Sequence, residues 1–302
     1  FDKAVADTCI VILHRDLSLT NDINVISNVE DLSKGLFVLK KILQSKYRDN
    51  RDFIFETKVN EVELRITDKI ESVSVPLKNF LRNYVGIVTG DNKRFISKTA
   101  ETNKHRKILI GRDLGRYILK NPQRYVLFDV DQLHSNTDEK VYQQNPKILI
   151  RKTGSSLFAT LDTNKTLTEQ TIYNLIPKVP IEFSLNLFLA LINSRLMQFY
   201  FTKKLITNPE AFPYIKGIHI DALPIRLPDL QKESERNLYN KLVELVDKML
   251  KLNKQLLIAK TDQENEALMR QIDATDHKID EEVYKLYGLT PEEIKIIESN
   301  NK

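Results

Sequence analysis

The pattern of apolar and polar positions is clearest in the last quarter of the chain. A first series of apolar residues is spaced alternately by four and three positions: Leu238, Leu242, Leu245, Met249, Leu252 and Leu256. A second series follows the polar stretch 261–265: Leu268, Ile272, Ile279, Val283 and Leu286. Such spacing is typical of a seam along which helices pack. We therefore predict two helices, interrupted at 261–265, that pack antiparallel because a short turn joins them.

The end of the chain carries the signals of one more helix. In GLTPEEIKIIE (288–298), Gly288 is a stop for the preceding helix and Thr290 is a candidate N-cap. Pro291 then occupies the first helical position, and Glu293 the third, where its side chain can reach back to the cap. A short final helix is predicted from residue 291.

The first quarter of the chain predicts strands and one helix. Residues 4–13 end in a β-branched apolar run, which indicates a buried strand. Residues 29–47 predict a helix with one apolar face. The leucines of that face are Leu32, Leu36, Leu39 and Leu43. Residues 52–59 and 61–67 alternate in the manner of two paired strands joined around Asn60.

Residues 80–160 follow a different pattern. Five of the eight glycines fall here, and short β-type runs alternate with turns. The predicted strands cover 84–88, 94–97, 107–110, 124–130, 147–153 and 156–161. They indicate a small irregular sheet with long loops, where binding residues tend to lie. A mostly buried helix is predicted for residues 184–205.

These elements predict an α+β chain. A small irregular β-sheet domain with flanking helices is followed by an antiparallel, coiled-coil-like helical hairpin. The predicted domains are residues 1–76, 77–228 and 229–302, and 302 residues fit two or three units of roughly 100–200 residues. A hydrophobic content of 41% is enough for a sizeable core.

Composition limits the class of protein and the cellular compartment that the chain fits. No window approaches about 18 consecutive apolar residues, so no membrane span is expected. Cys9 is the only cysteine, which excludes an internal disulfide and a Cys-based zinc site and fits a reducing cytoplasm. Residues 81–160 hold 15 Lys and Arg against 7 Asp and Glu, whereas 229–302 hold 12 against 16. A basic middle beside an acidic tail indicates a middle that meets a polyanion, although a solvated mixed surface has the same composition.

Two short motifs raise the alternative that the chain is an enzyme in its own right. HRDLSLTN (14–21) fills the fixed positions of the protein-kinase catalytic loop. The sequence lacks the other kinase motifs, so we interpret this stretch as a strand end and a polar turn. DFIFETK (52–58) spaces a carboxylate and a lysine as metal-dependent nucleases do, but no second carboxylate is placed to converge on an ion. No catalytic residue and no metal ligand is therefore assigned.

Three glycine-containing stretches of the basic middle carry the candidate binding residues. They are GIVTGDNKRFI (86–96), GRDLGRY (111–117) and NPKILIRKTG (145–154). Glycine permits close approach of the backbone, and Lys and Arg suit phosphates or guanine edges. The candidate contacts are Thr89, Asn92, Lys93, Arg94, Arg112, Arg116, Tyr117, Lys147, Arg151, Lys152 and Thr153. The alternative is three turns whose charges are merely solvated.

The order of several motifs resembles a known family. Stretches 86–96, 111–119, 147–162, 187–201 and 217–231 are similar, in that order, to the C-terminal specificity domain of TaqI-like adenine methyltransferases. The same domain occurs in type IIG restriction-modification enzymes. LALINSRL (189–196) and LPIRLP (223–228), followed by helical heptads, also resemble the target-recognition domain and spacer helix of type I specificity subunits.

The resemblance implies a function for this chain and a larger parent protein. The chain would recognise double-stranded DNA sequence-specifically, with Arg94, Arg112, Arg151 and Lys152 favoured as contacts. Residues 1–16 are similar to the end of a methyltransferase sheet, so the catalytic domain is expected before Phe1. The parent would methylate adenine N6 with S-adenosylmethionine, and would need Mg²⁺ if a nuclease is fused. DNA would lie between this chain and its own N-terminal methyltransferase domain, with the adenine flipped out.

The resemblance also implies a cellular compartment. One alternative function stays open. Restriction-modification enzymes of this kind act in the bacterial or archaeal cytoplasm. The alternative is a protein-interaction module that self-associates through the helical hairpin.

Overall fold

The computed structural model describes residue 12 and residues 22–31, 34–44, 61–205 and 215–300. The chain forms two compact units, residues 1–66 and 67–302. The predicted domain boundaries at residues 76 and 228 both lie within the second unit and stay predictions. Apart from residue 12, the predicted strands at 4–13 and 52–59 lie outside the described residues, as do the motifs HRDLSLTN and DFIFETK.

The first unit contains an antiparallel hairpin of β1 (Asp22–Asp31) and β2 (Leu36–Leu43). The helix predicted over 29–47 is wrong in the described part of that range. Gly35 adopts a φ of 70°, a left-handed conformation that suits glycine and helps to reverse the chain. The prediction followed the spacing of the leucines and gave this glycine no weight.

Helix α2 (Glu61–Ser72) replaces the strand predicted for 61–67. Its buried side chains repeat at helical spacing: Glu63, Ile66, Thr67 and Ile70. The alternation of Val62, Leu64 and Ile66 had suggested a strand because the window ended before Ile70.

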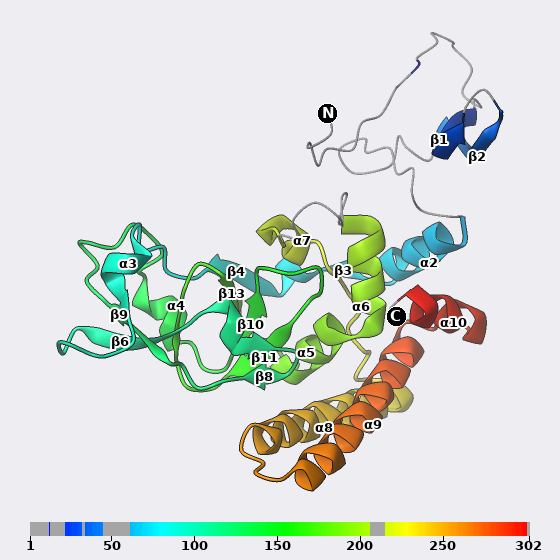
Figure 1. Cartoon of the computed structure of the whole chain (residues 1–302). Coiled ribbons are helices and arrows are strands. Elements are labelled where there is room, and N and C mark those ends of the chain that lie inside the picture. Colours follow the sequence, from blue (N-terminus) through cyan, green and yellow to red (C-terminus); the bar gives the residue numbers. More distant parts are fainter. Residues whose placement is uncertain (1–11, 13–21, 32–33, 45–60, 206–214, 301–302) are drawn as a thin grey trace. The chain divides into compact units, whose positions relative to one another are not determined.

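Two four-stranded sheets make up the middle of the second unit, which confirms the α+β class (Figure 1). The first sheet is antiparallel with the order β11-β10-β13-β4. Its strands are β4 (Leu81–Val85), β10 (Lys147–Arg151), β11 (Ala159–Asp162) and β13 (Ile172–Pro177). The second sheet has the order β12-β6-β9-β5, with β12 parallel to β6. Its strands are β5 (Ile96–Ser97), β6 (His105–Leu109), β9 (Arg124–Leu127) and β12 (Leu167–Thr168).

Short elements connect these strands. The helical ones are η2 (Leu77–Asn79), α3 (Asn92–Phe95), η3 (Gly111–Asp113), α4 (Glu139–Gln143) and α7 (Gly217–Asp221). The short strand pairs are β3 (Val75–Pro76) with β14 (Pro224–Ile225), and β7 (Leu114–Gly115) with β8 (Ile118–Leu119). The strand predicted at 94–97 is thus shared between α3 and β5. Strand β13 was not predicted.

The helix predicted for 184–205 is interrupted at Ser194. Helix α5 (Leu185–Asn193) is buried along its whole length, and α6 (Arg195–Tyr200) continues into a π-helical segment, η4 (Phe201–Leu205). Ser194 has an extended backbone, and its hydroxyl accepts a 3.1 Å hydrogen bond from the backbone N–H of Met197. The serine therefore ends one helix and caps the next.

The predicted helical hairpin is confirmed. Helices α8 (Glu233–Leu256) and α9 (Asp262–Leu286) pack side by side, and α8 also packs on α5 (Figure 1). The buried seam residues are Leu242, Met249, Leu252, Ile279, Val283 and Leu286. The interruption covers residues 257–261 and so lies earlier than the predicted 261–265, because Thr261 caps α9.

The last helix follows its sequence signals. Helix α10 (Pro291–Asn300) starts after Thr290, whose backbone N–H donates to Glu293 at 2.7 Å while the N–H of Glu293 donates back to the Thr290 hydroxyl at 3.3 Å. Gly288 has a φ of 66°, as a left-handed helix stop requires. Of the helices that the structure describes, none is long and apolar enough to cross a membrane.

Candidate nucleic-acid interface

The turn between β12 and β13, residues 169–171, is the point where the three basic stretches meet. Backbone hydrogen bonds attach the first stretch on both sides of this turn. Ile87 N donates to Thr168 O at 2.7 Å, and Gln170 N donates back to Ile87 O at 2.9 Å. Gly86 N donates to Ile172 O at 2.9 Å. A Cβ on Gly86 would lie 2.6 Å from Thr168 O, so only glycine fits this close approach.

Side chains of the first stretch continue this connection. The Thr89 hydroxyl donates to Asn92 Oδ1 at 2.5 Å, and Asn92 Nδ2 donates to Glu169 Oε1 at 3.4 Å. Thr89 and Glu169 are buried. Lys93 and Arg94 are exposed on α3, whose start is capped by the carboxylate of Asp91. The buried members thus fix the loop, and the cations face solvent.

The second stretch is attached through Thr171. The backbone N–H of Gly111 donates to the Thr171 hydroxyl at 2.9 Å, and that hydroxyl donates to Glu169 Oε2 at 2.5 Å. Glu169 therefore accepts from both the first stretch and the residue that holds the second. Arg112, the next residue after Gly111, is exposed.

The third stretch is attached through the same threonine. Lys152 N donates to Thr171 O at 2.9 Å, and the Lys152 ammonium lies 5.4 Å from the centre of the Tyr173 ring. Arg151 Nε donates to the Thr153 hydroxyl at 3.3 Å. Arg151, Lys152 and Thr153 are all partly exposed at the end of β10.

Lys147 is the clearest departure from the predicted contacts. Its side chain is fully buried, and its ammonium donates to Asp162 Oδ2 at 2.6 Å and to Tyr142 O at 3.1 Å. Burial lowers the pKa of Lys147, an effect that the carboxylate of Asp162 partly offsets. The residue joins β10 to β11 inside the fold, so we leave it out of the proposed DNA-binding surface.

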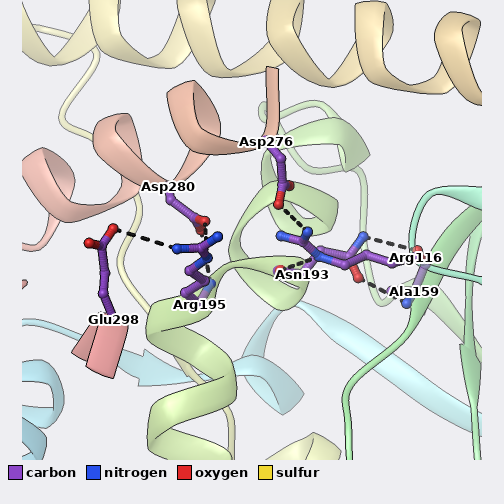
Figure 2. A network of polar contacts seen from close by, with 7 residues as sticks. All are labelled: Arg116, Ala159, Asn193, Arg195, Asp276, Asp280 and Glu298. Carbon is purple, nitrogen blue, oxygen red and sulfur yellow. Dashed lines mark hydrogen bonds and ion pairs between the residues drawn. The ribbon is translucent and has the colours of Figure 1, made fainter. Parts of the chain in front are cut away.

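Arg116 is partly exposed and is directed at Asp276 (Figure 2), and Tyr117 is buried. Arg116 Nε donates to the carbonyl of Asn193 at 2.8 Å, and its Nη1 forms an ion pair with Asp276 on α9. Tyr117 is buried and has a φ of 60°. Because the second stretch thereby ties the sheet to the helical hairpin, these two side chains support the interface from within.

Further members of this network connect α5, α6, α9 and α10. Asn193 and Ala159 bond each other twice, and Arg195 lies 3.3 Å from Asp280 and 3.7 Å from Glu298 (Figure 2). Burial raises the pKa of Asp280 to about 6, against the opposing effect of Arg195. The hairpin is therefore held to the sheet domain by polar as well as apolar contacts.

Sequence reasoning missed the residues that join the three stretches: Glu169, Gln170 and Thr171. A turn could have been predicted there, because TEQT (168–171) is a polar run before the apolar IYNLIP (172–177). It also missed a row of side chains across the second sheet. Lys107 in β6 stands opposite Tyr125 in β9, which stands opposite Ser97 in β5. These three side chains are exposed or partly exposed.

Comparison with known proteins agrees with this architecture. Residues 106–225 match the family model of the TaqI-like C-terminal specificity domain. The matched segment begins in β6 and ends in β14, so it contains the second and third basic stretches and residues 169–171. The resemblance suggested by the motif order is confirmed for this segment. No curated protein matches the chain in a sequence search.

Among solved structures, the chain resembles the type IIL restriction-modification enzyme MmeI in complex with DNA, with a TM-score of 0.50 and 13% identity. That alignment covers 91% of this chain but only 40% of MmeI, so the likeness concerns the fold of part of that enzyme. The S subunit of a type I system from M. genitalium has 14% identity and a TM-score of 0.39, over 61% of this chain and 41% of that one. The HsdS subunit from Thermoanaerobacter tengcongensis has 15% identity and a TM-score of 0.37, over 72% and 50%.

The described residues offer no candidate metal centre. No group of three or more His, Cys, Asp or Glu side chains within them is arranged to hold a metal ion. The two motifs that raised an enzymatic alternative lie outside the described residues.

Proposed function

We propose that this chain binds double-stranded DNA sequence-specifically, as the specificity portion of a restriction-modification enzyme. The observation that carries the proposal is the attachment of three basic stretches to one turn, residues 169–171. Their exposed or partly exposed cations form the proposed DNA-binding surface: Lys93, Arg94, Arg112, Arg151 and Lys152. Asn92 and Thr153 add uncharged polar groups beside them.

The charges and their supports suit this role. Phosphate contacts from Lys and Arg position a protein on a duplex, and base-edge contacts then read the sequence. Such contacts need side chains held at fixed positions. Here the backbone hydrogen bonds of residues 86–87, 111 and 152 hold the stretches, while the cations that follow them remain at the surface.

The finer part of the proposal concerns the parent protein. We infer a partner methyltransferase domain that precedes this chain and methylates adenine N6 with S-adenosylmethionine, in the bacterial or archaeal cytoplasm. Mg²⁺ would be needed only if a nuclease is also fused. Both groups would bind outside this chain, so no residue here is assigned to them. Transfer of labelled methyl groups from S-adenosylmethionine to duplex DNA by the parent protein would test this part.

Salt-dependent DNA binding tests the function of the chain itself. Fluorescence anisotropy of the 302-residue chain with a randomised duplex pool should show affinity that falls as salt rises, because bound cations release counterions. Replacing Arg112 by Gln should lower the slope of log affinity against log salt by about one if the residue contacts phosphate. Arg94→Gln and Arg151→Gln are tested in the same way.

Lys241→Gln is the matched control. This lysine is exposed on α8 in the acidic tail and pairs with Glu282 at 2.7 Å. Its replacement removes the same charge from the chain, and we expect an unchanged slope. Binding that does not respond to salt, or equal losses for Lys241→Gln and Arg112→Gln, would contradict the proposed surface.

The hairpin-based alternative finds no support in the described seam. Leu242, Met249, Ile279 and Val283 are already buried inside the chain, against α5 or between α8 and α9. Sedimentation at several protein concentrations would reveal self-association through other parts of the hairpin.

A further inference from the structure

We propose that Gln170 contacts a base edge in the bound duplex, an inference that rests on the proposed function. The side chains of its two neighbours are already hydrogen-bonded within the protein. Glu169 accepts from Asn92 and Thr171, and Thr171 accepts from the backbone of Gly111. The side chain of Gln170 is partly exposed, and it makes no hydrogen bond to any residue that the structure describes. The amide is therefore available to a ligand.

The position of Gln170 is central to the proposed DNA-binding surface. Its backbone N–H donates to Ile87 O, in the stretch that leads to Lys93 and Arg94. Through Thr171, the following residue, the same turn holds Gly111 and Lys152. A duplex that contacts cations from all three stretches would thus pass over the turn 169–171, to which all three are attached.

The backbone around Gln170 is fixed on both sides. Gln170 N donates to Ile87 O, and Ile172 N donates to Glu169 O, each at 2.9 Å. A side chain displayed from such a turn loses little backbone entropy on binding, which favours specific contacts.

The chemistry of the amide distinguishes Gln170 from its charged surroundings. A Lys or Arg can bind any phosphate, so it carries little sequence information when it does so. A glutamine amide offers one donor and one acceptor side by side, which pair with N7 and N6 of adenine in the major groove. The geometry therefore points to an adenine within the recognised sequence as the ligand of Gln170.

The test compares Gln170→Ala and Gln170→Glu with the unaltered 302-residue chain. A site is first selected from randomised duplexes, and binding is then measured to duplexes that carry each base at each position. Gln170→Ala should reduce discrimination at one A·T position roughly 5- to 150-fold, the range of one bidentate base contact. Gln170→Glu should shift the preference at that position toward cytosine, whose N4 group donates to carboxylates.

Gln123→Ala is the control, since Gln123 is an exposed glutamine of the same domain that bonds the carbonyl of Asn121. It should leave every base preference unchanged. Urea unfolding of each variant separates loss of fold from loss of contact.

The outcomes distinguish the two proposals. An unaltered chain that discriminates among no duplexes overturns the proposed function. A chain that discriminates, but whose preferences Gln170→Ala leaves unchanged at every position, overturns the role of Gln170 alone. A uniform loss of affinity with a smaller salt slope would make Gln170 part of a phosphate contact, which also overturns base recognition.

Discussion

Asn193 and Ala159 exchange two hydrogen bonds, each 2.9 Å long. The backbone N–H of Ala159 donates to Asn193 Oδ1, and Asn193 Nδ2 donates to the carbonyl of Ala159. The side-chain amide on α5 thus pairs with the first residue of β11, an edge strand of the first sheet, in the way that a neighbouring strand would. Both residues are buried, so water does not replace either bond.

Replacing Asn193 by Ala should destabilise the second unit by about 1–3 kcal/mol, because the buried N–H of Ala159 loses its partner while the Ala159 carbonyl keeps only the bond from the backbone N–H of Tyr117. Urea unfolding followed by circular dichroism measures the change. Asn186→Ala on the same helix is the matched control, since Asn186 Nδ2 bonds only the exposed Asp247 carboxylate. We expect a smaller loss there, because no backbone group is left without a partner. Equal losses would contradict the role assigned to Asn193.

The elements that sequence predicted well are those fixed by nearby residues. The α8–α9 seam repeats over several turns, and the α10 cap needs only Thr290, Pro291 and Glu293. The predictions for residues 29–47 and 61–67 were wrong because short apolar runs fit a helix and a strand almost equally well. In the first range the turn at Gly35 favours a pair of strands. In the second, the apolar face that continues to Ile70 favours a helix.

The proposed DNA-binding surface was predicted only in part, for a different reason. Its cations could be found because they cluster in sequence. The residue that organises them, Glu169, acquires its role from Asn92, which lies 77 positions away. Lys147 was misassigned because a lysine that pairs across two strands with Asp162 has the same local sequence as a solvated one.

The Lys147–Asp162 pair supplies a second prediction. Lys147→Met should cost about 3–5 kcal/mol of unfolding free energy, because it leaves a buried carboxylate without its counter-charge. Asp162→Ala should cost more, since Asp162 also accepts from the backbone N–H groups of Asn164 and Thr166 at 2.8 and 2.9 Å. Urea unfolding of the two variants gives the order. A Lys147→Met variant as stable as the unaltered chain would show that the lysine is not needed in the core.

Gly86 supplies a third prediction. A methyl group there would meet the backbone of Thr168 and Glu169, which cannot rotate away, so Gly86→Ala should displace the first stretch from residues 169–171. We expect a loss of about 3 kcal/mol or more in stability, the upper range for overpacking, together with weaker DNA binding. Gly217→Ala is the control, because its Cβ would meet the movable side chain of Asn83 at 3.2 Å. If both variants unfold at the same urea concentration, close backbone approach at Gly86 is not the constraint.

The pH dependence of folding supplies the last prediction, through Asp280. Burial raises the pKa of Asp280 to about 6, and the charge of Asp276 adds to the rise. The backbone N–H and guanidinium of Arg195 and the charge of Arg116 lower the pKa and so oppose it. Because the pKa is 3.8 when the group is exposed, the folded chain binds more protons between about pH 4 and 6. The contribution of Asp280 to stability is therefore complete below about pH 4 and is lost as the pH rises through 6, by on the order of 3 kcal/mol.

Asp280→Asn isolates this effect. Carboxylates whose pKa is lowered, such as Glu264 and Glu292, stabilise the fold less as the pH falls. The variant and the unaltered chain share these groups, so their effect cancels in the difference. The unfolding free energy of the variant minus that of the unaltered chain, from urea titrations at pH 4 to 7.5, should rise with pH up to about 6 and then level off. A difference that stays level over this interval would mean that the ion pair with Arg195 outweighs burial, and that Asp280 is ionised throughout.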